Sequence, residues 1–168
     1  MERDIRSLYF TGYCYWSMEA VFSHLRGVKD VQSGWVSLKE SYEIEAVRVV
    51  FLPDDIDPSA LIAIHLSMHR TDLQQGIKKR YPSKVCTEIE ADIDVIQSLI
   101  EDISQRSNRI YYCKSERLST FRPADARYDD YYLSGPEKPY CHQYIRPKLD
   151  QLKDGWPELF IHKDVVPE

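Results

Sequence analysis

The stretch TGYCYWSMEAVFSHLRGV, residues 11–28, runs from the end of an apolar segment into an amphipathic one. Its apolar positions recur at the three- and four-residue spacing of one helix face, and Gly27 supplies a stop. The stretch therefore predicts a helix over Trp16–Arg26, directly after a buried strand at SLYFTGYC, residues 7–14. The positions that keep the helical spacing are Met18, Val21, Phe22 and Leu25.

Two further strands are predicted after this helix. VKDVQSGWVSL, residues 28–38, predicts a strand with a turn at Ser33-Gly34, and EIEAVRVVFLP, residues 43–53, predicts a strand because it is rich in β-branched residues and ends in proline. Asp57-Pro58 then indicates the start of a second helix. The order strand–helix–strand–strand–helix favours an α+β fold, a ferredoxin-like two-layer sandwich.

The rest of the chain has weaker patterns. They predict a basic loop at 74–84, a strand at 85–89, a helix through 95–103, a strand at 109–115 and a short tyrosine-rich helix at 124–133. Prolines crowd the sequence after residue 134, so we expect an irregular C-terminal tail. The prediction is one domain over residues 1–168, with a core at about 7–133 and the tail at about 134–168.

The composition argues against several functional classes. The 168 residues are 43% hydrophobic and carry a net charge of −5 without a basic cluster, which predicts no nucleic-acid partner and no membrane partner. The start, MERDIRS, is too charged for a signal peptide, so we expect a cytoplasmic protein with reduced cysteines. No C-x-x-C pair occurs, which argues against a zinc site and a dithiol motif, and we expect no metal and no organic cofactor.

Cys14 lies where the first predicted strand passes into the helix. A thiol in the first helical turn faces unpaired backbone N–H groups and the positive end of the helix dipole. Such a position can lower a thiol pKa from about 8.5 to roughly 3.5–7.5, which predicts a reactive Cys14. The alternative is a core thiol, because free cysteine is among the most buried residue types. Tyr15 and Trp16 follow at once and could form an apolar wall beside the sulfur.

Glu45 is a candidate partner for this thiol. On its predicted strand it shares a face with Val47, Val49 and Phe51, and a carboxyl group at the head of an apolar row is a candidate for a raised pKa and for proton donation. The alternative is an acid at a strand end that reaches water. A thiol together with an acid is a more specific signal than either residue alone.

Two stretches in order resemble the A type of peptide methionine sulfoxide reductase. The first, YCYWSMEAVFSHLRGV, is similar to the family motif G-C-F-W-G-x-E-x-x-F. The second, EIEAVRVVFLP, is similar to the later family motif H-A-E-x-V-x-V-x-[FY]-D-P. FRPADARYDDYY and EKPYCHQYIRPKLDQL resemble later motifs of that family, so the likeness covers residues 7–152. Several positions depart from the family pattern. Tyr13 and Ser17 replace glycines, and Tyr128 replaces a histidine. The loop before the acid, GWVSLKESYEIE, is shorter than in the family. The segment GIKKRYPS is also shorter, and Tyr81 in it is the best match to a family tyrosine.

The resemblance implies a reaction. Cys14 would attack the sulfur of methionine S-sulfoxide, free or in oxidised proteins, and Glu45 would protonate the oxygen. Tyr15 and Trp16 would hold the methyl group, and Tyr81 could bind the oxygen. The resemblance also places the resolving cysteine at Cys141, which we expect on a mobile segment, and implies a thioredoxin-like reductant.

Two other functional classes stay open from sequence. One is a degenerate, non-catalytic binding module with the same fold, which the shortened loops favour and the retained Cys14–Glu45 pair disfavours. The other is a different cysteine enzyme, a hydrolase or acyltransferase, which would need a histidine base. The histidines, at positions 24, 65, 69, 142 and 162, have no diagnostic sequence context.

Overall fold

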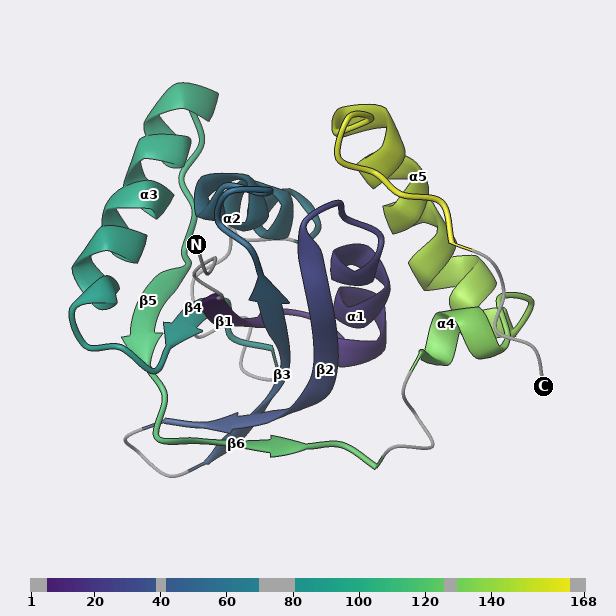
Figure 1. The fold of residues 1–168 in the computed structure, drawn as a ribbon, viewed down its shortest axis with the longest axis horizontal. Helices are drawn as coiled ribbons and strands as arrows, with labels where there is room; N and C mark the ends of the chain where they lie inside the picture. Colours follow the sequence, from purple (N-terminus) through teal and green to yellow (C-terminus); the bar gives the residue numbers. More distant parts are fainter. Residues whose placement is uncertain (1–5, 39–41, 70–80, 126–129, 164–168) are drawn as a thin grey trace.

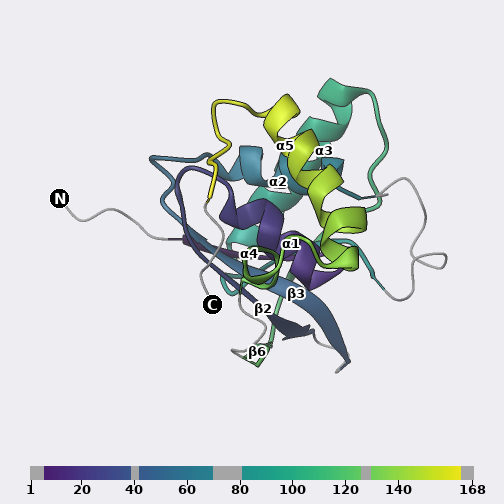
Figure 2. The same ribbon diagram turned by 90° about the vertical axis from the view of Figure 1, so that its right-hand side faces the viewer.

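The structure is a computed structural model that describes residues 6–38, 42–69, 81–125 and 130–163. A six-stranded sheet in the order β5-β4-β1-β3-β2-β6 forms its centre, and the helices gather on one face of that sheet (Figures 1 and 2). The strands are β1 (Arg6–Thr11), β2 (Val28–Ser37), β3 (Glu43–Phe51), β4 (Lys84–Thr87), β5 (Lys114–Arg117) and β6 (Thr120–Pro123). The helices are α1 (Tyr15–Ser23), α2 (Pro58–Ser67), α3 (Asp92–Ser107), α4 (Tyr131–Ser134), the π-helix η2 (Cys141–Ile145) and α5 (Arg146–Gly155).

The first four strands carry the topology predicted from sequence. β1 lies between β3 and β4, β2 lies outside β3, and each of these pairs is antiparallel. With α1 between β1 and β2 and α2 between β3 and β4, this is the split β-α-β arrangement. β5 pairs with β4 in parallel, so the complete sheet is mixed. The α+β class is confirmed, and β5, β6 and the helices from α3 onward extend the predicted core.

The core lies between the sheet and the helices. Phe10 of β1 and Phe22 of α1 are fully buried and stack with ring centroids 4.5 Å apart. The opposite face of the sheet carries a smaller apolar cluster in which Tyr9 packs against Phe121, with ring centroids 5.3 Å apart. α1 is thus held on the sheet by its apolar stripe, which fixes the position of the turn before it.

Some predicted elements are wrong in detail. The turn predicted at Ser33-Gly34 is absent because β2 pairs with β3 without interruption from Asp30 to Ser37. The strand predicted at 109–115 begins only at Lys114. The predicted loop over 74–80 and residues 126–129 of the predicted tyrosine-rich helix, which include Tyr128, lie outside the described residues.

The predicted irregular C-terminal tail is also wrong, because η2 and α5 form a helical run beside α1 (Figure 1). The prolines are placed where a helix tolerates them. Pro147 falls in the first turn of α5, where its missing N–H costs little. The backbone N–H of Arg146 donates to the carbonyl of Cys141, a five-residue bond that makes the turn before Pro147 wider than an α-helical turn.

α5 is tied to the rest of the fold by Lys148. Its Nζ donates to the Met68 carbonyl at the end of α2 and lies 4.7 Å above the ring of Tyr13. A cation is favourable at a helix C-terminus because the last carbonyl groups carry partial negative charge. None of the helices formed by the described residues has the length and apolarity needed to cross a membrane.

We predict that Phe22→Ala lowers the free energy of unfolding by about 3–5 kcal/mol, because it removes a fully buried ring from the α1–sheet contact. Urea denaturation followed by circular dichroism measures this change. Val95→Ala, at a side chain that is 55% exposed on α3, is the control and should change stability by about 0.5 kcal/mol or less. Equal losses for the two variants would contradict the assigned core.

Candidate active site

The turn between β1 and α1 requires glycine at position 12. Gly12 has a φ of 147°, and a Cβ atom there would lie 2.5 Å from Nε2 of His69. Glycine avoids both the backbone strain and the clash. The chain can therefore reverse direction tightly and present Cys14 at the start of the helix.

Cys14 is the N-cap residue of α1. Its carbonyl accepts hydrogen bonds from the backbone N–H groups of Ser17 and Met18, each at 3.0 Å. It is a free, half-buried thiol, whereas Cys86, Cys113 and Cys141 are free and buried. The structure therefore places the predicted nucleophile at a helix N-terminus as expected, and makes it the most accessible of these thiols.

The pKa of Cys14 differs from the sequence-based prediction. Burial raises the pKa of the thiol, and the negative charge of Glu45 raises it further. Interactions with the Tyr140 hydroxyl and the backbone N–H groups of Trp16 and Ser17 lower it. Burial outweighs the effect of the helix N–H groups, so the net pKa of Cys14 lies above the ordinary value and not below it as predicted.

Glu45 reaches the same site from the sheet. It is half-buried on β3 and lies directly opposite Trp35 of β2. Its charge acts on the pKa of Cys14, so the structure brings together the thiol and the acid that the sequence singled out. An acid beside a buried sulfur can move a proton to a group that the sulfur attacks.

An aromatic cluster of Trp16, Tyr131 and Tyr140 covers one side of the site. Trp16 and Tyr131 stack with ring centroids 4.0 Å apart and an interplanar angle of 6°. Tyr140 meets Trp16 edge-on at 5.7 Å. Tyr15 turns toward the sheet, where it meets Trp35 edge-on at 5.5 Å. Tyr15 and Trp16 also pack against each other, with ring centroids 5.9 Å apart, so the two predicted wall residues lie side by side.

Glu19 ties the elements around the site together. Its side chain is almost fully buried; Oε1 accepts from the backbone N–H of Tyr131 at 3.2 Å, and Oε2 accepts from the Ser33 hydroxyl at 3.3 Å. A buried carboxylate is tolerable only with such partners. Sequence reasoning gave Glu19 no role, although it stands in the first motif; its position on the buried side of the predicted helix was the available signal.

Tyr140 and Tyr131 are the site residues that sequence reasoning missed. Nothing in the local sequence pattern of Tyr140 points to Cys14, which is 126 residues earlier in the chain. The Tyr140 hydroxyl lies 3.5 Å from Oγ of Ser17, and a hydrogen-bond interaction with Cys14 helps to raise the pKa of the phenol. Tyr81 is half-buried and close enough for its charge to act on the pKa of Tyr140, so it lies at the edge of the same site.

Cys141 directly follows Tyr140 and is fully buried. It is the first residue of η2 and packs in an apolar cluster with Ala20, Ile145 and Leu149. It lies outside the sheet, as expected, but in a helical turn and not in the irregular chain that the prolines predicted. Burial raises the pKa of Tyr131, and the Cys141 and Cys14 charges both add to that increase, so this ring lies within reach of both sulfurs.

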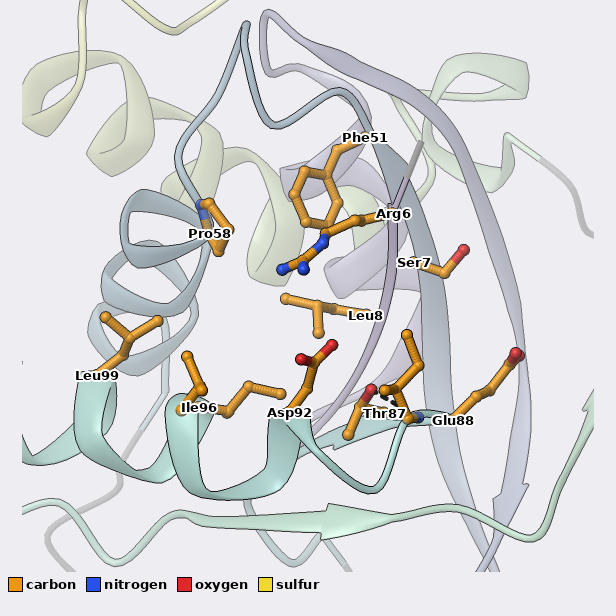
Figure 3. A pocket seen from close by; sticks show the side chains of 12 residues that line it. Arg6, Ser7, Leu8, Phe51, Pro58, Thr87, Glu88, Asp92, Ile96 and Leu99 are labelled. Carbon is orange, nitrogen blue, oxygen red and sulfur yellow. Dashed lines mark hydrogen bonds between the residues drawn. The ribbon is translucent and has the colours of Figure 1, made fainter. Parts of the chain in front are cut away.

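A cavity of about 210 Å³ lies away from this site, beside the start of β1 (Figure 3). Leu8, Phe51 and Ile96 form apolar walls, and the side chains of Arg6 and Asp92 extend toward the space between them. Cys14 follows the other end of β1, and none of the predicted site residues lines this cavity. It has no part in the chemistry of the thiol.

The described residues contain no group of three or more histidine, cysteine or acidic side chains arranged to hold a metal ion. Among these residues, no histidine is a cause of the Cys14 pKa shift. His24, the C-cap residue of the same helix, donates from Nδ1 to the carbonyl of Ala20 at 2.6 Å. His69 lies against Gly12 in the turn before Cys14, and its two ring nitrogens bond the His65 carbonyl at 2.7 Å and the Ser83 hydroxyl at 2.8 Å.

A half-buried thiol at a helix N-terminus, paired with a carboxyl group and a phenol on an α+β fold, defines a cysteine-dependent enzyme site. The family pattern of peptide methionine sulfoxide reductase matches residues 6–159. The chain therefore belongs to the peptide methionine sulfoxide reductase family, and it is an oxidoreductase of that family.

Individual relatives agree with this assignment. The chain is 28% identical to peptide methionine sulfoxide reductase MsrA of Campylobacter jejuni over 165 residues, which is 90% of this chain and 100% of that protein. The solved structure of Mxr1 from Saccharomyces cerevisiae in reduced form has a TM-score of 0.68 at 14% identity, covering 83% of this chain and 92% of that chain. The structure of Mxr1 in complex with Trx2 has a TM-score of 0.57 at 15% identity, covering 78% and 89%. These solved structures share the fold.

We predict that iodoacetamide labels Cys14 before the other cysteines, because it is the most accessible, and that its labelling rate rises with pH through the alkaline range. The thiolate is the reacting form, and a raised pKa means that it is scarce at neutral pH. Mass spectrometry of tryptic peptides at several pH values measures the rate at each thiol. A Cys14 rate that is already constant from pH 6 to 8 would show a lowered pKa and contradict the account.

Proposed function

We propose that the chain reduces methionine S-sulfoxide, free or within peptides and proteins, to methionine, with Cys14 as nucleophile and Glu45 as proton donor. The observation that carries this proposal is that the half-buried thiol of Cys14, at the start of α1, interacts with the carboxyl group of Glu45 on β3. Both residues lie within the segment that matches the family pattern.

Cys14 and Glu45 together supply the electrons and the proton that the reduction needs. The Cys14 thiolate supplies an electron pair to the sulfoxide sulfur, and Glu45 supplies a proton to the sulfoxide oxygen. The sulfoxide is reduced to a thioether, which leaves as methionine, and Cys14 is oxidised to a sulfenic acid that keeps the oxygen. In this proposal Tyr15 and Trp16 hold the methyl group, and the phenol of Tyr81 hydrogen-bonds the sulfoxide oxygen.

Glu45 also acts on the charge of the thiol. A negative Glu45 opposes the Cys14 thiolate, because it raises the pKa of the thiol. A Glu45 that holds a proton exerts no such repulsion, so the state with a thiolate and a protonated acid is the reactive one. A proton on Glu45 therefore favours the Cys14 thiolate, which is the state that attacks the sulfoxide.

Regeneration uses a second thiol. In this proposal the Cys141 thiol condenses with the Cys14 sulfenic acid to form a disulfide and release water. A thioredoxin-like protein then reduces that disulfide. The solved relative in complex with Trx2 supports a reductant of this kind. Because Cys141 is fully buried in the reduced chain, the disulfide requires a local rearrangement of η2.

The experiment that tests the proposed function follows both epimers of N-acetylmethionine sulfoxide by chiral chromatography with dithiothreitol as reductant. The S epimer should disappear while the R epimer remains, and Cys14→Ser should consume neither. If wild type consumes neither epimer, the chain is a binding module of the same fold. If Cys14→Ser retains activity, another residue is the nucleophile.

We predict that Glu45→Gln lowers kcat by about 10²–10⁴-fold, the range for loss of a general acid, with a smaller effect on substrate binding. Steady-state kinetics at saturating sulfoxide measure the loss. Glu43→Gln is the matched control, because Glu43 lies on the same strand but is exposed and pairs with Arg122 at 2.6 Å. An unchanged rate in Glu45→Gln would remove this residue from the mechanism.

We predict a Cys14–Cys141 disulfide after one equivalent of sulfoxide is added without reductant. Peptide mapping identifies the linked cysteines. Cys141→Ser should complete a single turnover but should not cycle with thioredoxin. A disulfide from Cys14 to Cys86 or Cys113, or a sulfenic acid that persists in wild type, would count against the assignment of Cys141.

A further inference from the structure

Tyr140 is the side chain that the C-terminal segment places on the reacting sulfur. It precedes the buried Cys141, and its hydroxyl lies 3.5 Å from the hydroxyl oxygen of Ser17 in the first turn of α1. From there it acts on Cys14 as a hydrogen-bond partner that lowers the pKa of the thiol. Its ring is held edge-on to Trp16 at 5.7 Å and to Tyr131 at 6.4 Å. Contacts on both ends of the side chain therefore fix the hydroxyl at the start of α1.

The direction of this hydrogen bond follows from the two partners. Burial raises the pKa of Tyr140, and the interaction with Cys14 raises it further, so the phenol keeps its proton. The same interaction lowers the pKa of Cys14 and works against the burial of the thiol. The hydroxyl therefore donates, the sulfur accepts, and the bond strengthens when the sulfur becomes a thiolate.

The covalent link between Tyr140 and Cys141 gives this contact a second consequence. Consecutive Cα atoms lie 3.8 Å apart, and a disulfide needs Cα atoms within roughly 7 Å of each other. In the reduced chain the Tyr140 hydroxyl, at the far end of a long side chain, acts on the pKa of Cys14, while Cys141 is packed among Ala20, Ile145 and Leu149. Bringing Cys141 to Cys14 moves the backbone of Tyr140 and removes its hydroxyl from the sulfur.

The chain has a structural feature that suits this movement. The wide turn of η2 begins at Cys141, where the N–H of Arg146 bonds the Cys141 carbonyl five residues back. Such π turns are uncommon in helices and are found frequently at functional sites. Lys148 holds the following helix at the end of α2, so a rearrangement can be confined to the turn that carries Tyr140 and Cys141.

We propose that Tyr140 is a catalytic residue of this site, whose hydroxyl donates a hydrogen bond to Cys14 in the reduced enzyme and is displaced when Cys141 bonds the same sulfur. This inference deepens the proposed function and rests on it for the second step. In that step the Cys14 sulfenic acid and the Cys141 thiol form a disulfide and water. The first step concerns the thiol alone and needs no substrate.

The test compares Tyr140→Phe with Tyr144→Phe. Tyr144 is 51% exposed and its ring packs 5.0 Å from that of Tyr140, so it controls for loss of a hydroxyl on the same element. Iodoacetamide labelling of Cys14 is measured from pH 7 to 10.5, with no sulfoxide present. We expect the Cys14 profile of Tyr140→Phe to move to higher pH, with about three- to tenfold slower labelling at pH 8. Tyr144→Phe should match wild type.

A Tyr140→Phe profile that coincides with wild type would overturn the proposal, as would an equal shift in both variants. Because the assay uses no sulfoxide, its result is independent of whether the chain turns over that substrate. The second step is tested by the rate at which the Cys14–Cys141 disulfide closes. Because diamide reacts with thiolates, and Tyr140→Phe has fewer Cys14 thiolates, only closure from the Cys14 sulfenic acid is compared. That acid is formed with one equivalent of hydrogen peroxide, and its conversion to the disulfide is followed by dimedone trapping at intervals. We expect faster conversion in Tyr140→Phe than in wild type, since no hydrogen bond has to be broken; equal or slower conversion would refute the displacement.

Discussion

The arrangement of the site depends on the buried carboxylate of Glu19. It accepts from the Ser33 hydroxyl on β2 and from the backbone N–H of Tyr131 at the start of α4, and so joins α1 to the sheet and to the C-terminal part of the chain. The second contact sets Tyr131 against Trp16, and this stack is the surface on which Tyr140 rests. Without Glu19 a buried N–H would lose its partner, at a cost of about 1–3 kcal/mol.

The chemistry of Cys14 is a balance between burial and local donors. Burial opposes a thiolate, and the helix N–H groups alone do not compensate for it. The site adds the Tyr140 phenol as a hydrogen-bond donor. It also adds Glu45, which repels the Cys14 thiolate when it is ionised and does not repel it when it is protonated. Because its raised pKa keeps Cys14 mostly protonated near neutral pH, the thiol is less prone to wasteful oxidation, which requires the thiolate.

The parts that were predicted from sequence are those with strong local patterns. The apolar spacing around Phe22 predicted α1, the β-branched run predicted β3, and together they predicted the α+β order. The first motif also led to Cys14, and the apolar row of the second motif, which begins at Glu45, led to Glu45. Cys14 and Glu45 could be found from sequence because each occupies a defined position next to or within a predicted helix or strand.

The features that the sequence did not reveal, namely the C-terminal helices, the pKa of Cys14 and the place of Tyr140, depend on contacts between distant segments. Prolines after residue 134 suggested irregular chain, but Pro147 sits in the first turn of a helix, where proline is tolerated. The pKa of Cys14 depends on how deeply the folded chain buries it, which local sequence does not reveal. Tyr140 reaches Cys14 only because α5 packs on α1, so its role required the folded structure.

The central claim is that Cys14 donates the electron pair that reduces the sulfoxide. The most direct measurement is the amount of methionine formed per chain when fully reduced, desalted protein meets excess methionine S-sulfoxide without any reductant. The account predicts one methionine per wild-type chain and none for Cys14→Ser. Equal yields from the two proteins would contradict it.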